Sequence, residues 1–207
     1  MKRIIVAITG ATGVIYGIRL LEALRDSGVE THLILSGQAA ENILHETDRT
    51  AEGVKGLATV VHDEKNLAAS ISSGSFRTDG MVVAPCTVKT LSAIANSYND
   101  NLVARAADVV LKERRRLILA VRETPLHRGH LDLMLRVADM GGIVLPPVPA
   151  FYFNPRTIGE LIDHSVGKML DLMDIDHSLF RRWQGEYETG ALKNTPAGVE
   201  ENDHGSL

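Results

Sequence analysis

The chain has 207 residues, a length that suits one α/β domain whose core is large enough to need no disulfides or metals. Its net charge of -4 gives no overall attraction to nucleic acid or anionic membranes, and its single cysteine excludes an internal disulfide. Residues 1–3 lead directly into a predicted strand, and no apolar run approaches the roughly 20 residues that cross a bilayer. We therefore expect a cytoplasmic protein that contacts neither membranes nor nucleic acid.

The first seventeen residues predict a strand, a tight turn and a helix. Residues 4–8 are almost uniformly apolar and β-branched, as in a strand buried on both faces of a parallel sheet. A turn bracketed by Gly10 and Gly13 follows, and then Tyr16 and Leu20 begin a helical spacing. Glycines let a ligand approach the backbone and the amides of a new helix attract anions, so this turn is a candidate phosphate site. An ordinary strand-to-helix turn that uses glycine for its geometry explains the same residues equally well.

Strands and helices then alternate along the chain. Further strands are expected at 29–35, 58–61, 81–85, 117–122 and 143–145, and further helices at 38–46, 88–95, 101–114, 131–140 and 157–173. The Ser- and Gly-rich stretch 68–77 has the composition of a mobile surface loop, and the prolines at 146–149 force an extended exit. The pattern predicts one domain over residues 1–183 and a polar, flexible tail at 184–207.

Strands separated by helices indicate a single-domain α/β fold, a doubly wound parallel sheet of the Rossmann-like or flavodoxin-like type with helices on both faces. Such sheets bind ligands at the carboxyl ends of their strands. The chemically informative residues fall at these ends, namely at 9–13, 36, 85–90, 122–123 and 149–152. Their hydroxyls, cations and helix-start amides predict a site for a mononucleotide phosphate and one further phosphate.

Several motifs, in this order, resemble the UbiX-type flavin prenyltransferases. They are ITGATG at 8–13 with YG at 16–17, ETD at 46–48, APCTVKTL at 84–91, NL with RAAD within 101–108, LKERR at 111–115, RETP at 122–125 and PAFY at 149–152. The resemblance extends from residue 4 to about residue 183. It implies an enzyme that joins the dimethylallyl group of dimethylallyl phosphate to N5 and then C6 of reduced FMN, without a metal. The prenylated FMN would serve a separate UbiD-type decarboxylase.

The same resemblance implies roles for individual residues. The flavin contacts would be Gly10, Ala11, Thr12, Ser36, Thr87, Val88, Lys89, Thr90 and Arg122. Tyr152 and Lys168 would bind the prenyl phosphate, with Arg105 and Lys112 close by in the catalytic group. Glu123 would protonate the departing phosphate, and Glu46 would move the flavin proton during ring closure. A homo-oligomer, typically a dodecamer, is implied, in which Trp183 approaches the flavin of a neighbouring subunit.

Two positions depart from the family's usual pattern. Thr12 stands where many members have serine, and Phe153 stands where histidine is common. Both changes bear on the rate and on the fit of the substrate.

Two other functions remain open from the sequence. An FMN-dependent cysteine decarboxylase of the related fold would carry a P-x-M-N-x-x-M-W stretch, which this chain lacks. A non-catalytic FMN-binding accessory subunit of a decarboxylase would not need Tyr152, Glu123 and Lys168.

Further polar residues receive simpler interpretations. Cys86 follows a strand and is expected to be a small buried side chain. His127 and His130 are too few for a recognisable metal site, and Asp171 with Asp174 is expected to be solvated surface rather than a magnesium pair. Lys112 begins a short basic run at a helix end and is expected to turn inward.

Overall fold

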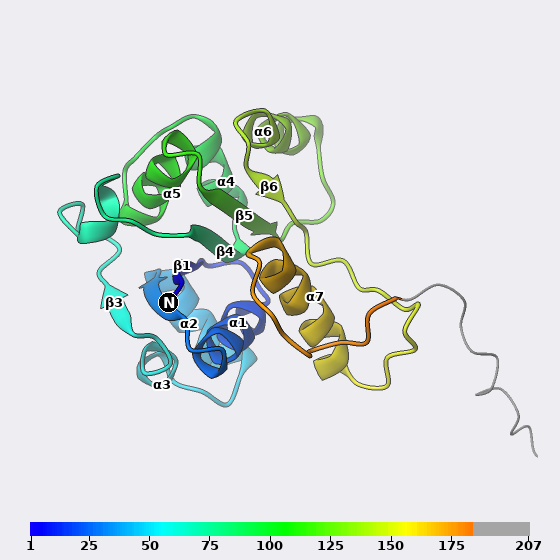
Figure 1. Cartoon of the computed structure of the whole chain (residues 1–207). Coiled ribbons are helices and arrows are strands. Elements are labelled where there is room, and N and C mark those ends of the chain that lie inside the picture. The colour runs from blue at the N-terminus through cyan, green and yellow to red at the C-terminus, as the bar shows by residue number, and fades with distance from the viewer. Residues whose placement is uncertain (184–207) are drawn as a thin grey trace, which may run out of the picture.

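A computed structural model describes residues 1–183, and the tail predicted at 184–207 lies outside this range. In the described part of the chain, six parallel strands form one sheet in the order β3-β2-β1-β4-β5-β6 (Figure 1). The strands are β1 (Arg3–Ile8), β2 (Glu30–Leu35), β3 (Val60–His62), β4 (Gly80–Cys86), β5 (Arg116–Val121) and β6 (Ile143–Val144). This order confirms the doubly wound sheet, and it changes direction between β1 and β4, the switch point where such sheets bind ligands.

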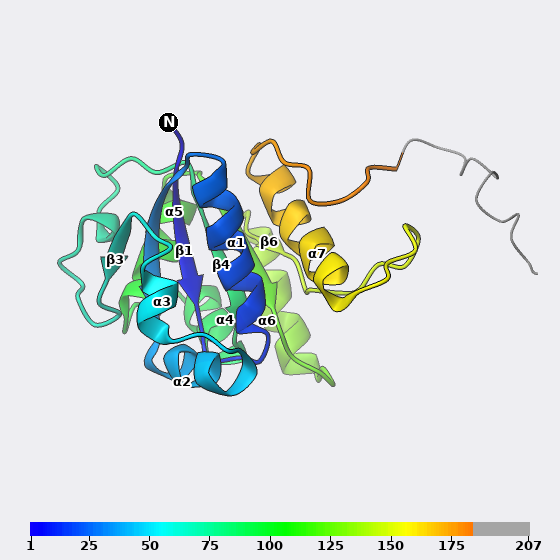
Figure 2. The ribbon, with the colours of Figure 1, turned by 90° about the horizontal axis from the view of Figure 1, so that it is seen from below.

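Helices cover both faces of the sheet (Figures 1 and 2). They are α1 (Val14–Asp26), α2 (Gly37–Glu46), α3 (Ala51–Lys55), α4 (Val88–Ala95), α5 (Leu102–Lys112), α6 (Arg128–Asp139) and α7 (Ile158–Leu172), with a 3-10 turn at Ser70–Ser72. α1 and α7 pack on one face, and α4, α5 and α6 pack on the other. None of these helices is both long and apolar enough to cross a membrane.

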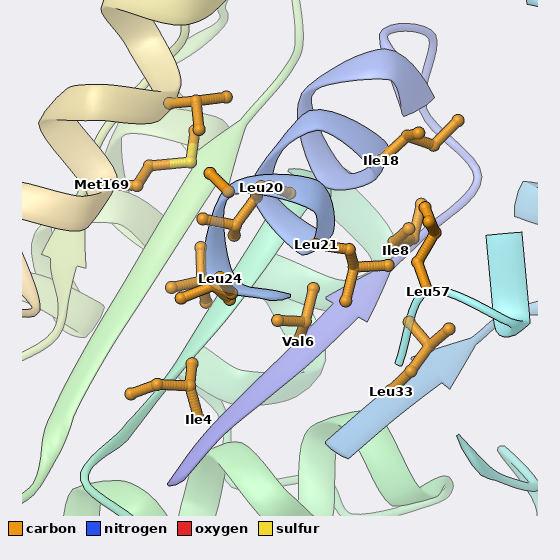
Figure 3. Close-up of a cluster of buried hydrophobic side chains, with 14 of the residues drawn as sticks. Ile4, Val6, Ile8, Ile18, Leu20, Leu21, Leu24, Leu33, Leu57 and Met169 are labelled. Carbon is orange, nitrogen blue, oxygen red and sulfur yellow. The ribbon is translucent and has the colours of Figure 1, made fainter. Parts of the chain in front are cut away.

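The central strand β1 is buried on both faces, which explains its uniformly apolar sequence. Its alternate side chains belong to two separate clusters of buried residues. Ile4 and Val6 pack with Leu20 of α1 and Met169 of α7 in the first cluster, which Figure 3 shows. Ile5 belongs to the second cluster, under α4 and α5. Because β1 is packed on both faces, the turn that follows it starts from a well-packed strand at the centre of the sheet.

α1 lies very close to the sheet at Gly17. A Cβ atom at this position would lie 2.2 Å from the carbonyl oxygen of Ala84 in β4 and 2.7 Å from Cγ1 of Ile8. A backbone carbonyl cannot move aside as a flexible side chain can, so only glycine allows this approach. The close contact holds the turn after β1 against the end of β4.

The stretch 68–77, predicted as a mobile surface loop, is tied to the domain by arginines. Nε of Arg105 donates to the Ser72 carbonyl at 3.1 Å, and a terminal nitrogen of Arg115 donates to the Gly74 carbonyl at 2.8 Å. Both arginines come from the α5 to β5 region, more than thirty residues away along the chain. The Ser- and Gly-rich composition predicts a loop here, but it does not predict which arginines bind the loop carbonyls.

The segment after α7 folds back over that helix. The Asp171 carboxylate accepts two hydrogen bonds from Arg182, at 2.6 and 3.1 Å, and one from His177 at 3.1 Å. These donors, Arg182 before His177, lower the pKa of Asp171. A Cβ atom at Gly167 would lie 2.4 Å from the Phe180 ring, so the small residue admits the returning chain. The prediction that Asp171 is merely solvated surface is therefore wrong, because it anchors this segment.

Several element boundaries differ from the sequence prediction. α6 begins at Arg128 rather than at 131, because Nδ1 of His127 accepts from the Gly129 amide at 3.0 Å and caps the helix. α5 ends at Lys112 rather than at 114. The short helix Ala51–Lys55 and the 3-10 turn were not predicted, because elements of five residues or fewer carry too little periodicity to recognise.

Candidate functional site

A cleft of about 410 Å³ opens at the carboxyl ends of β1, β2 and β4. Small-molecule sites typically measure about 300 to 1,000 Å³. The lining combines hydroxyl groups, charged side chains and helix starts, and it consists of Thr9, Gly10, Ser36, Gly37, Gln38, Glu64, Thr87, Lys89, Thr90, Ala93, Asn101 and Ala104. The structure thus brings together residues from three separate strand ends that the sequence assigned to one ligand.

Thr9 joins the two turns at the switch point. Its buried hydroxyl donates to the Pro85 carbonyl at 2.8 Å and accepts from the Thr87 amide at 3.0 Å. The Thr9 amide also donates to the Pro85 carbonyl, at 3.2 Å. One side chain therefore sets the position of the β4 to α4 turn relative to β1, and with it one wall of the cleft.

Ser36 and Thr87 are the N-caps of α2 and α4. Oγ of Ser36 accepts from the Ala39 amide at 3.2 Å, and Oγ1 of Thr87 accepts from the Thr90 amide at 3.1 Å. Both helices consequently begin at the cleft. The amides and dipole at the start of α4 favour an anion, whereas the Gly37 amide at the start of α2 already donates to the Glu64 carboxylate at 3.3 Å. Lys89, exposed in the first turn of α4, adds a positive charge. These donors fit the phosphate group of a mononucleotide such as FMN.

At the start of α1, as at Gly37 of α2, a protein carboxylate accepts from helix-start amides. Oε2 of Glu46 accepts from the amides of Gly13 and Val14, at 2.7 and 3.1 Å. Nδ2 of Asn42, one turn earlier on α2, donates to the Gly10 carbonyl at 3.1 Å. The turn after β1 is therefore held from α2, and in this structure its helix-start amides bind Glu46 rather than a free anion.

The other residues assigned to the flavin surround the cleft without lining it. Ala11 and Thr12 lie in the turn after β1, and Val88 is the first residue of α4. Arg122 follows β5 and is exposed. Its charge reaches Tyr16 of α1, where it opposes the rise in the tyrosine pKa that burial causes.

Glu123 lies beside the β4 to α4 turn. The preceding residue, Arg122, donates its amide to the Cys86 carbonyl at 3.0 Å, which aligns the end of β5 with the end of β4. Glu123 is exposed, and its Oε1 accepts from the Thr124 amide at 2.9 Å. The two carboxylates assigned to acid/base roles thus come from opposite sides of the switch point, Glu46 from the end of α2 and Glu123 from the loop after β5.

Tyr152 and Lys168 meet around His164. The Tyr152 hydroxyl lies 2.8 Å from Nε2 of His164, and Lys168 follows His164 by one turn of α7. Burial, and then the charge of Lys168, lower the pKa of His164. Trp183 also contacts the Tyr152 ring edge-on, with a centroid separation of 6.2 Å. The structure therefore gathers the residues assigned to the prenyl phosphate into one group that also holds the only tryptophan.

Lys112 and Arg105 lie on α5 and do not line the cleft. Lys112 is the last residue of α5, at the end of the sheet where the strands begin, and it is exposed and paired with Glu113. The expectation that Lys112 turns inward is wrong for the single chain, because the Lys112 ammonium group pairs with the Glu113 carboxylate at the end of α5 and stays exposed. Arg105 pairs with Asp108 at 3.3 Å and is turned toward the 68–77 stretch.

Cys86 is completely buried at the end of β4, and burial raises the pKa of its thiol well above the ordinary value. A thiolate is therefore strongly disfavoured, which confirms the structural interpretation of this residue. The His127 and His130 rings contact each other at the start of α6, with centroids 3.6 Å apart and 33° between their planes. Among the described residues, no group of three or more His, Cys, Asp or Glu side chains could hold a metal ion.

Sequence reasoning missed three residues that support these groups. Asn42 lies four residues before Glu46, and His164 lies four residues before Lys168, so in each case helical spacing placed them on one face. Glu64, from the loop after β3, accepts from the Gly37 amide at 3.3 Å and closes the far edge of the cleft. No local pattern identifies Glu64, because its partner lies 27 residues away.

Comparison with known proteins shows the family to which the chain belongs. The family model described as Flavoprotein matches residues 1–184. The flavin prenyltransferase UbiX of Thauera aromatica is 55% identical over 192 residues, which cover 93% of this chain and 99% of that protein. The flavin prenyltransferase UbiX of Escherichia coli K12 is 54% identical and covers 89% of this chain and 100% of its own length.

Solved structures show the same similarity. AnUbiX (PadA1), solved in complex with FMN and dimethylallyl pyrophosphate, has a TM-score of 0.89 and 53% identity, covering 90% of this chain and 99% of that chain. A dodecameric FMN-dependent UbiX-like decarboxylase from Escherichia coli O157:H7 has a TM-score of 0.86 and 50% identity, covering 88% and 100%. The cysteine decarboxylase TvaF, at 18% identity and a TM-score of 0.60, shares the fold alone. With more than half of its residues identical over nearly the full length of these enzymes, the chain belongs to the flavoprotein family and, within it, to the UbiX-type flavin prenyltransferases.

Proposed function

We propose that this chain joins the dimethylallyl group of dimethylallyl phosphate to N5 and C6 of reduced FMN. The observation that best supports the proposal is the cleft at the switch point, where residues matching the family's flavin contacts gather from three strand ends. The relative solved with FMN and dimethylallyl pyrophosphate supports the same pair of ligands. Reduced FMN, when bound, supplies the electron-rich ring atoms that accept the allyl group. The prenylated product would then serve a UbiD-type decarboxylase.

The starts of α2 and α4 would hold the FMN phosphate. Ser36, Thr87, Thr90 and Lys89 offer hydroxyls and an ammonium group around the helix-start amides. The turn at residues 10–12, together with Val88 and Arg122, would surround the rest of the flavin. Thr9 ties the turn after β1 to the turn before α4, so the proposed flavin contacts on these two turns would keep a fixed position relative to each other.

Tyr152 and Lys168 would hold the prenyl phosphate. An allylic phosphate departs more readily when cations and hydrogen-bond donors stabilise its growing negative charge. Glu123 would deliver a proton to that phosphate, and Glu46 would move the flavin proton during ring closure. That the reaction needs no metal ion stays a prediction. In this prediction, positively charged side chains take the place of a metal and stabilise the leaving phosphate.

Arg105 and Lys112 would contribute from a neighbouring copy of the chain. Within one chain Lys112 lies where the strands begin, whereas the cleft lies where they end. The solved UbiX-like relative from Escherichia coli O157:H7 is described as dodecameric. A closed homo-oligomer, predicted to be a dodecamer in the cytoplasm, would bring α5 of one copy to the cleft of another. Light scattering would show the oligomeric state. Full activity from a strictly monomeric protein would contradict an active site that is shared between copies of the chain.

The deciding experiment is anaerobic incubation of the protein with reduced FMN and dimethylallyl phosphate, followed by mass analysis of the released flavin. We expect a flavin heavier by one prenyl group. A parallel incubation with dimethylallyl pyrophosphate would show which leaving group the enzyme prefers.

Glu123→Gln serves as the matched variant in this assay. The amide keeps the shape of the side chain but cannot deliver a proton, so both ligands should still bind while prenyl transfer slows. Flavin binding with no prenyl transfer by the unmodified protein would favour the non-catalytic FMN-binding subunit instead.

A further inference from the structure

The contact between Tyr152 and His164 joins a largely exposed tyrosine to a buried histidine. The two polar atoms lie 2.8 Å apart, although Tyr152 is 44% exposed and His164 is 8% exposed. The imidazole is fixed by other rings: it stacks on Phe153 with centroids 5.0 Å apart and 7° between planes, and it contacts Phe180 at 4.7 Å. His164 therefore presents Nε2 to the tyrosine hydroxyl from a buried ring that packs against two aromatic side chains.

The direction of this hydrogen bond decides whether Tyr152 can still donate to a phosphate. A tyrosine hydroxyl has one hydrogen to donate and oxygen lone pairs that can accept. If Nε2 of His164 accepted that hydrogen, Tyr152 would have none left to donate to a phosphate. If Nε2–H donates to the phenol oxygen, the hydroxyl hydrogen stays free for an anion.

The surroundings of His164 favour the neutral imidazole over the charged imidazolium. Burial and the Lys168 charge, one turn along α7, disfavour the imidazolium, and the Asp171 carboxylate opposes them only in part. Asp171 itself is engaged with Arg182, His177 and, at 3.8 Å, Lys168. The imidazole thus lies between the tyrosine and the lysine that would share one phosphate.

We propose that His164 is a positioning residue, which donates from Nε2–H to the Tyr152 oxygen and so directs the Tyr152 hydroxyl hydrogen toward the prenyl phosphate. The inference rests on the proposed function, because it takes that phosphate as the ligand of Tyr152 and Lys168. His164 itself does not touch the substrate in this arrangement. Its contribution passes through the tyrosine hydroxyl alone.

The test is a double-mutant cycle with His164→Phe and Tyr152→Phe. Phenylalanine at 164 keeps a ring between Phe153 and Phe180 but removes Nε2, and Tyr152→Phe removes only the hydroxyl. Dimethylallyl phosphate binding is measured by calorimetry on the holoprotein loaded with oxidised FMN, so that no turnover occurs. His164→Phe alone should raise the dissociation constant about two- to tenfold, the usual range for one hydrogen bond. In the Tyr152→Phe background the same change should have almost no effect.

Rescue and control measurements make the outcome decisive. His164→Gln, whose side-chain amide can donate from a similar position, should recover most of the affinity that His164→Phe loses. FMN affinity should stay unchanged in every variant. Equal losses from His164→Phe in both backgrounds, or no loss in either, would overturn the inference, since a purely structural histidine acts regardless of the tyrosine hydroxyl.

The two proposals fail in different ways. A protein that binds dimethylallyl phosphate and shows the coupling, yet never prenylates reduced FMN, would refute the proposed function and leave the His164 assignment standing. A protein that prenylates FMN but shows no coupling would refute the His164 assignment alone. Absence of any dimethylallyl phosphate binding would overturn both.

Discussion

Replacing the Thr9 hydroxyl tests whether the two turns at the switch point are coupled. Thr9→Val keeps the shape of this buried side chain but removes a donor to the Pro85 carbonyl and an acceptor for the Thr87 amide. The Pro85 carbonyl keeps its bond from the Thr9 amide, whereas the Thr87 amide loses the partner that holds it. Two lost hydrogen bonds, with the half-buried Thr87 amide left without its protein partner, should lower the free energy of unfolding by about 1 to 3 kcal/mol.

The assay is urea unfolding at one fixed protein concentration, with FMN titration as a second measurement. Thr9→Ser is the matched control, since it keeps the hydroxyl and loses only a methyl group, a change of about 1 kcal/mol. FMN should bind more weakly to Thr9→Val than to Thr9→Ser, because the Thr87 turn lines the cleft. Equal stability and equal FMN affinity in the two variants would refute the coupling.

Three further outcomes are expected. Lys168→Ala should weaken dimethylallyl phosphate binding about ten- to a hundredfold in calorimetry while FMN affinity stays nearly constant; loss of FMN instead would place α7 at the flavin. Gly17→Ala should destabilise the protein severely in thermal unfolding, because its Cβ would lie 2.2 Å from a β4 carbonyl oxygen, whereas Gly56→Ala, whose Cβ would find no atom closer than 3.5 Å, should be nearly neutral. The pKa of Glu30 is lowered from 4.5 to about 2, first by its hydrogen bond from Arg3, so its carboxylate stabilises the fold above pH 4.5 and loses that effect as the pH falls toward 2. Glu30→Gln should therefore reduce stability to urea at pH 7, by a difference that shrinks below pH 4.5; a difference independent of pH would exclude the ionised pair as its cause.

The sequence by itself determined the order of the strands and helices and the doubly wound class of the sheet. Those features depend on local signals, such as the apolar run of β1, the glycines after it and the capping hydroxyls of Ser36 and Thr87. It also located the cleft, because residues that follow parallel strands must meet at one edge of the sheet. Three family motifs agreed with this placement, since ITGATG, APCTVKTL and RETP fall at the ends of β1, β4 and β5, whereas ETD, RAAD and LKERR lie on or just after the helices α2 and α5.

Only the tertiary structure decided which polar groups bind another protein group and which lie far from the cleft. Glu46 occupies the start of α1 from the end of α2, and Lys112 lies at the opposite end of the sheet from the cleft. Likewise, the bond between Tyr152 and His164 joins a loop to a helix twelve residues later. Hydrophobic periodicity specifies which face of an element is buried but not which distant side chain its polar groups will meet. Those partners are selected by packing, because most buried donors and acceptors must find one once the apolar faces are in place.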